Sequence, residues 1–81
     1  MNKYQKLLRK ISRQDRERII TAIHLIEIRD FSSLHNIKKL SATENKYRLR
    51  IGNFRIFFRI HKDYNEILDI DRRDDNTYSK L

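Results

Sequence analysis

Two runs of alternating residues around Gly52-Asn53 constrain the fold of this chain most strongly. Apolar residues occupy every second position on both sides of the turn, as Tyr47, Leu49 and Ile51, then Phe54, Ile56, Phe58 and Ile60. Such alternation around two turn-forming residues predicts an antiparallel β-hairpin, and glycine in the first loop position suits a type II′ turn. The expected cross-strand pairs are Ile51 with Phe54, Arg50 with Arg55, Arg48 with Phe57, and Lys46 with Arg59.

Helical spacing precedes the hairpin. Tyr4, Leu7, Leu8 and Ile11 follow the i, i+3, i+4, i+7 pattern of a short amphipathic helix. Ser12 stands three residues before Asp15, which is typical of an N-cap, and a second helix is predicted from Arg13 to about Arg29. Its apolar face carries Ile19, Ala22, Ile23 and Ile26. The short connection favours packing of the two helices as an antiparallel pair.

The segments around the hairpin complete the predicted fold. A third strand is expected from Glu66 to about Arg72, after a turn over residues 62–65. The pattern of residues 30–45 is weaker and is interpreted as a turn of helix and an anchored loop. The whole predicts a single domain over residues 1–81 of the α+β class, with two N-terminal helices packed on a small antiparallel sheet.

Composition limits the kinds of site that such a domain can hold. The 81 residues include 19 Lys and Arg against 11 Asp and Glu, a net charge of +8, which indicates a polyanionic partner. A chain of this size has room for a surface site or a shallow groove. It has no cysteine, which excludes disulfides, cysteine-ligated zinc and iron–sulfur clusters. His24, His35 and His61 are far apart in the sequence without supporting carboxylates, so we expect neither a metal nor a cofactor.

The sequence also bears on location in the cell. Its longest apolar run, residues 56–58, is far shorter than the roughly 20 residues of a membrane span, and its first residues form no hydrophobic signal region. A cytoplasmic protein is expected.

The second face of the predicted hairpin is cationic. The segment from Lys46 to Arg59 contains no acidic residue, although like charges facing each other across strands are unfavourable. Guanidinium groups bind phosphate and an aromatic ring stacks on a base, so this face is typical of a single-stranded nucleic-acid site. The face comprises Lys46, Arg48, Arg50, Arg55 and Arg59 around Phe57. Two other interpretations stay open: the cations serve to prevent aggregation of exposed strands, and the C-terminal tail covers Phe57.

The last residues add cations and a phenol. Arg72 and Arg73 end the predicted third strand, and Tyr78 follows. A tyrosine hydroxyl and guanidinium groups at one rim can position a 2′-hydroxyl and stabilise a pentavalent phosphate. The alternative is a disordered polar tail, as chain termini often are.

The segment from Lys46 to Phe58, preceded by Leu40 and followed by Arg72-Arg73 and Tyr78, resembles the RelE/ParE superfamily of type II toxin–antitoxin toxins. The order of helix, helix and sheet agrees from about residue 3 to the end. That family opens with a β-strand before its first helix, whereas helical spacing here starts by Tyr4, so the family's first strand is missing from the predicted pattern.

The resemblance implies a toxin that is a small, metal-free endoribonuclease, or mRNA interferase, acting on mRNA in the ribosome and silenced by a cognate antitoxin. The implied reaction is attack of a 2′-hydroxyl on the adjacent phosphate, which leaves a 2′,3′-cyclic phosphate. Arg48 and Arg50 stand where RelE has two lysines that contact phosphate and help activate the 2′-hydroxyl. Arg55 and Arg72 match arginines that stabilise the transition state, with Arg73 as a competing choice for the second. Tyr78 matches a tyrosine that orients or stacks on the substrate base.

The remaining predictions concern partners and alternatives. Further contacts to RNA are expected from Lys46, Phe57, Arg59 and Arg73. The resemblance implies a heterotetramer or larger complex with the antitoxin, and a +8 domain suits an acidic segment that folds on binding. Two other functions stay open: inhibition of DNA gyrase, as in the ParE branch, and RNA binding without catalysis.

Overall fold

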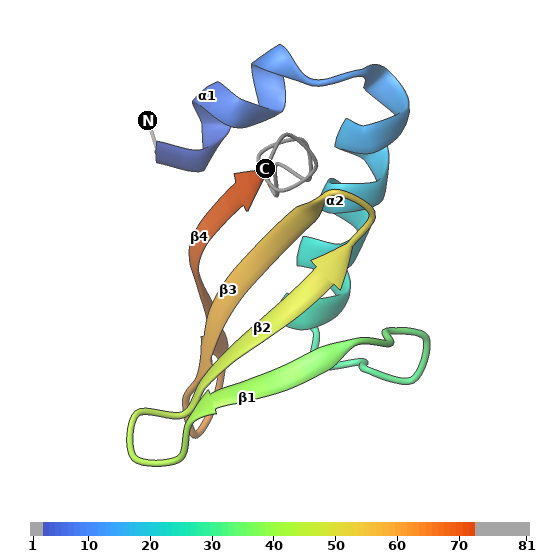
Figure 1. Cartoon of the computed structure of the whole chain (residues 1–81). Coiled ribbons are helices and arrows are strands. Elements are labelled where there is room, and N and C mark those ends of the chain that lie inside the picture. The colour runs from blue at the N-terminus through green and yellow to red at the C-terminus, as the bar shows by residue number, and fades with distance from the viewer. Residues whose placement is uncertain (1–2, 73–81) are drawn as a thin grey trace.

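The chain forms two helices followed by a four-stranded antiparallel sheet (Figure 1). A computed structural model describes residues 3–72. The elements are α1 (Lys3–Lys10), α2 (Arg13–Glu27), β1 (Ile37–Ser41), β2 (Lys46–Ile51), β3 (Phe54–Ile60) and β4 (Asn65–Arg72). The strands lie in the order β1-β2-β3-β4, so each strand pairs with its neighbour in sequence. The predicted α+β fold, with helices before the sheet, is confirmed.

The central hairpin has the predicted register. Ile51 faces Phe54, Arg50 faces Arg55, Arg48 faces Phe57 and Lys46 faces Arg59. Gly52 has a φ of 54°, whereas Asn53 is not among the residues with positive φ, as a type II′ turn requires. The turn therefore fixes which side chains of β2 and β3 share a face.

The junction between the helices is stabilised by two side chains. The Ser12 hydroxyl accepts a hydrogen bond from the backbone N–H of Asp15 at 3.2 Å, which confirms the predicted N-cap. The Arg16 guanidinium donates from Nε to the carbonyl of Leu8 at 2.8 Å and from Nη2 to that of Ile11 at 3.4 Å. Arg16 thus satisfies carbonyls at the end of α1 that lack a helical partner.

The predicted antiparallel packing of the helices on each other is wrong. Both helices pack on β4, and they meet at a steep angle (Figure 1). The connecting residue Ile11 is itself buried in the core, which draws the junction onto the sheet instead of letting the chain reverse beside α1.

α2 ends two residues before the predicted limit. Arg29 has a φ of 64°, and its N–H donates to the carbonyl of Ile26 while that of Asp30 donates to the carbonyl of Leu25. These two bonds form a Schellman motif. Glycine usually occupies the left-handed position of this motif, which Arg29 occupies here. The Arg29 side chain donates to the carbonyl of Lys62 at 2.8 Å, which ties this end of α2 to the turn between β3 and β4.

β1 replaces part of the predicted loop, and the sheet has four strands instead of three. Its pairing with β2 is irregular between Lys39 and Ser41, and Leu40 is 45% exposed. An edge strand with a bulge loses the alternation by which strands are identified, because few of its side chains are buried. The strand therefore has no periodic signal in the sequence.

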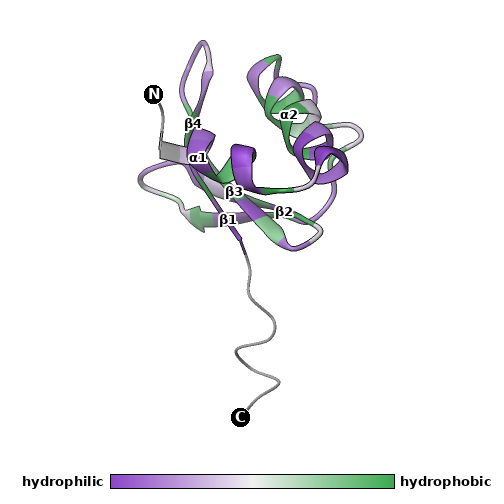
Figure 2. Ribbon diagram, turned by 90° about the horizontal axis from the view of Figure 1, so that it is seen from above, coloured by the Kyte–Doolittle hydropathy of each residue, from purple (hydrophilic) through white to green (hydrophobic). Residues whose placement is uncertain are grey.

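The core lies between the helices and one face of the sheet (Figure 2). Phe58 is fully buried, and its ring stacks against Phe31 and Tyr47 with centroid distances of 6.1 and 5.7 Å. The buried apolar residues are Ile11, Ile19, Ala22, Ile26, Leu49, Phe54, Ile56, Phe58 and Ile70. The opposite face of the sheet is thereby left free for polar side chains. Within residues 3–72, neither helix has the length and apolar character needed to cross a membrane.

Candidate nucleic-acid interface

The face of the sheet opposite the core, called here the outer face, carries both cations and acids. Its register places Arg48 opposite Phe57 and Arg50 opposite Arg55, as the sequence predicts. β4 adds Asp71 opposite Arg55. The segment 46–59 itself contains no acid, but acids from outside it reach this face.

Three of the five predicted cations are paired with carboxylates. Arg55 donates from Nε and Nη2 to the two carboxylate oxygens of Asp71, at 2.8 and 2.9 Å. Glu44 Oε1 lies 3.4 Å from Lys46 Nζ and 3.8 Å from Arg59 Nη2. Arg59 Nε also donates to the carbonyl of Glu44 at 3.2 Å. These pairs lower the positive charge at the β3–β4 side of the face and beside the β1–β2 loop.

Arg48 and Arg50 differ from the other cations of the hairpin. Together with Lys38 of β1 they line a groove of about 210 Å³, whose other lining residues are Asn36 and Ile37. We call this the cationic groove. Within residues 3–72, the structure pairs none of its three cations with a carboxylate.

One nitrogen of the Arg48 side chain lacks a hydrogen-bond partner. Its Nε is buried and has no hydrogen-bond partner. A buried donor without a partner is unfavourable by about 1–3 kcal/mol, more when charged. Burial of this nitrogen means that the Arg48 guanidinium is partly withdrawn from solvent, unlike a fully solvated surface cation.

The start of β1 shapes the groove. Asn36 has a φ of 64°, in a region that asparagine tolerates, and its carbonyl accepts from the N–H of Arg50 at 3.3 Å. The next residues then pair with β2, which brings Lys38 opposite Arg48. Sequence reasoning missed Lys38 and Asn36 because it did not predict β1. The turn-favouring residues Ser41, Thr43 and Asn45, which surround the start of the loop before β2, are the one signal of a preceding hairpin partner.

Phe57 is partly covered by a cation. The guanidinium carbon of Arg55 lies 5.9 Å from the Phe57 ring centroid. The ring is half-buried and lies between the cationic groove and Asp69 of β4. Covering of the ring by the C-terminal tail concerns residues outside those that the structure describes.

The structure does not bring Arg72 to the outer face. Arg72 is opposite Phe54 in the register, and its guanidinium carbon lies 5.8 Å from the centroid of that core ring. It therefore sits at the end of the sheet on the side of the helices, whereas Arg48, Arg50 and Arg55 point to the other side. The predicted site residues Arg73 and Tyr78 lie outside the described residues.

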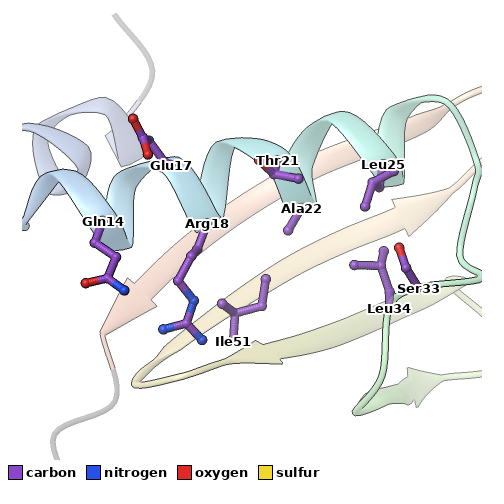
Figure 3. A pocket seen from close by; sticks show the side chains of 9 residues that line it. All are labelled: Gln14, Glu17, Arg18, Thr21, Ala22, Leu25, Ser33, Leu34 and Ile51. Carbon is purple, nitrogen blue, oxygen red and sulfur yellow. The ribbon is translucent and has the colours of Figure 1, made fainter.

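A second groove, of about 440 Å³, lies on the helix side of the sheet between α2 and β2 (Figure 3). Ala22, Leu25, Leu34 and Ile51 give it an apolar floor, and Arg18 and Glu17 lie at its rim with opposite charges. Its balanced charge does not select a polyanion, so the cationic groove is the better candidate for a nucleic acid.

The other titratable groups supply no catalytic cluster in residues 3–72. No three His, Cys, Asp or Glu side chains gather there as metal ligands. His61 hydrogen-bonds Glu66 at 2.9 Å and stacks on Tyr64, away from the groove. Hydrogen bonds from the Ser32 hydroxyl and backbone hold the pKa of Asp30 below its ordinary value, in an exposed loop.

Comparison with known proteins adds no relative: no family model, no curated protein and no solved structure matches this chain. The chemistry of the site therefore rests on its own residues. Two guanidinium groups and an ammonium group facing one groove suit a phosphate with its neighbouring ribose.

Proposed function

We propose that this protein is a RelE/ParE-type toxin that binds mRNA on the ribosome and cleaves it without a metal. One observation carries the proposal: Lys38, Arg48 and Arg50 line a groove without a neutralising carboxylate in residues 3–72, and a buried donor of Arg48 lacks an acceptor. The family resemblance of the segment 46–58 supplies the reaction type.

In the proposed reaction, Arg48 and Arg50 hold the phosphate that the neighbouring 2′-hydroxyl attacks. Charge on the phosphate oxygens increases in the pentavalent transition state, and two fixed guanidinium groups stabilise that state more than the substrate. A cognate antitoxin with an acidic segment is the proposed inhibitor, because such a segment covers and neutralises the same groove.

The Arg55 contact favours a second candidate, RNA binding without cleavage. Arg55 is held by Asp71 in a two-bond contact, and Arg72 lies on the other side of the sheet. Both arginines match transition-state residues in the family resemblance, and neither lines the cationic groove.

Mapping of mRNA ends on translating ribosomes tests both candidates. We compare the wild-type protein with the double variant Arg48→Gln/Arg50→Gln. A matched control, Arg9→Gln/Lys62→Gln, removes the same two charges at exposed positions outside the groove. Circular dichroism checks that all three proteins are folded.

We expect cuts in the ribosomal A site with the wild-type and control proteins, and at least about 100-fold fewer cuts with the groove variant. RNA binding without cuts by the wild-type protein would support the second candidate. Breaks in DNA that depend on gyrase, with no effect on mRNA, would contradict both.

A further inference from the structure

The proposed cleavage needs a group that removes the proton of the 2′-hydroxyl. A guanidinium keeps its proton until far above neutral pH, so arginines such as Arg48 and Arg50 bind phosphate but are poor bases. The cationic groove contains a different kind of group on β1. We propose that the side-chain amine of Lys38, when deprotonated, accepts that proton; this inference rests on the proposed nuclease function.

The register of β1 selects Lys38 over its neighbour Lys39. Lys38 is opposite Arg48, lies on the outer face and lines the groove. Lys39 is opposite Tyr47, and its Nζ lies 5.9 Å from the centroid of that ring on the other face of the sheet. Two adjacent lysines on one edge strand are thus directed to opposite sides, and only the first lines the cationic groove.

The surroundings of Lys38 leave its amine free to act. No carboxylate in residues 3–72 pairs with it, so no ion pair must break before it meets a substrate. β1 pairs with β2 alone, and the charged groups that face Lys38 from β2 are Arg48 and Arg50. The two other lining residues, Asn36 and Ile37, are uncharged.

The proposed reaction needs no oxidant, no metal and no reactant other than water. The bond from the 2′-oxygen to phosphorus forms as its proton moves to the neutral Nζ of Lys38. The bond from phosphorus to the 5′-oxygen then breaks, and that oxygen takes a proton from water. The products are a 2′,3′-cyclic phosphate and a 5′-hydroxyl, and the Lys38 ammonium returns its proton to the solvent.

The variant Lys38→Arg separates proton transfer from binding because it retains the charge but not the basicity. We measure the affinity of each protein for a short single-stranded RNA, and its rate of mRNA cleavage on translating ribosomes at saturating protein. Lys39→Arg is the matched control on the same strand. We expect Lys38→Arg to bind RNA within about twofold of wild type and to cleave about 100-fold more slowly, the range of general-base catalysis. Lys39→Arg is expected to match wild type in both.

A chemical substitution adds a readout that a structural role would not change. The chain has no cysteine, so Lys38→Cys treated with 2-bromoethylamine carries an aminoethyl thioether at this position alone. Its amine has a lower pKa than lysine because of the neighbouring sulfur. We expect the modified protein to regain cleavage, with its pH–rate profile levelling off at a lower pH than that of the wild-type protein.

Three outcomes would overturn the inference, and they are distinguishable. Cleavage by Lys38→Arg at the wild-type rate would leave the proposed function intact and remove Lys38 from proton transfer. A fall in affinity that accounts for the whole loss of activity would make Lys38 a binding residue only. Binding without cleavage by the wild-type protein would instead refute the proposed nuclease function, and this inference with it.

Discussion

Gly52 shows how one residue determines the geometry of the outer face. Its φ of 54° makes the two-residue turn that sets Arg50 opposite Arg55 and Arg48 opposite Phe57. An added Cβ would also lie 3.4 Å from Nη1 of Arg18, the residue of α2 that covers the turn.

The variant Gly52→Ala is expected to lower the free energy of unfolding by about 1–2 kcal/mol, because an L side chain is strained at this φ. Urea denaturation measures the loss. Asn53→Ala, at the next turn position, serves as the control and should change the stability by less than about 0.5 kcal/mol. Equal losses in the two variants would show that the turn does not depend on a left-handed residue.

The pKa of Asp30 depends on two hydrogen bonds from one neighbouring residue. The Ser32 hydroxyl donates to Asp30 Oδ1 at 2.7 Å, and the Ser32 N–H donates to the same atom at 3.2 Å. Both bonds favour the carboxylate and hold the pKa of Asp30 below its ordinary value. Their contribution to stability is therefore present at neutral pH and is lost as the pH falls through the lowered pKa.

Ser32→Ala removes the shorter bond, so the pKa of Asp30 should rise towards its ordinary value. A carboxyl NMR titration measures this shift, and Ser33→Ala is the control. An unchanged Asp30 titration in Ser32→Ala would contradict the role of the hydroxyl.

The elements differ in how far the sequence predicts them. β2 and β3 are identified, register included, because burial of one face imposes strict alternation and Gly52-Asn53 permits one loop length. The second helix is identified through its apolar face and its cap at Ser12. β1 is not, because an exposed edge strand with a bulge has no periodic burial. The site predicted from the sequence lacks Lys38 for the same reason, because Lys38 belongs to β1.

The cap of α2 has a measurable effect on stability. Ser12→Ala removes the acceptor for the Asp15 N–H, which should lower the free energy of unfolding by about 1 kcal/mol. Chemical denaturation of Ser12→Ala and of the exposed control Ser33→Ala gives the difference. Identical midpoints for the two variants would show that the cap contributes nothing.

The net charge of +8 is distributed unevenly over the molecule. The sequence shows an acid-free segment from Lys46 to Arg59, but the fold brings Glu44 and Asp71 against three of its cations. Sequence reasoning could not place these acids, because their pairing depends on a loop and a strand outside that segment. Within residues 3–72, the outer-face cations without a carboxylate partner are those that line the cationic groove.

Arg48 and Arg50 are proposed to bind RNA phosphate, and the salt dependence of the affinity for RNA tests this directly. Each phosphate contact contributes a slope of about −0.7 to a plot of log affinity against log salt for a single strand. We compare wild type with Arg50→Gln and with Lys62→Gln, which removes the same charge from an exposed turn. We expect a slope of at least about 1.4 in magnitude for wild type, smaller by about 0.7 in Arg50→Gln and unchanged in Lys62→Gln. Equal slopes for the two variants would contradict phosphate binding by Arg50.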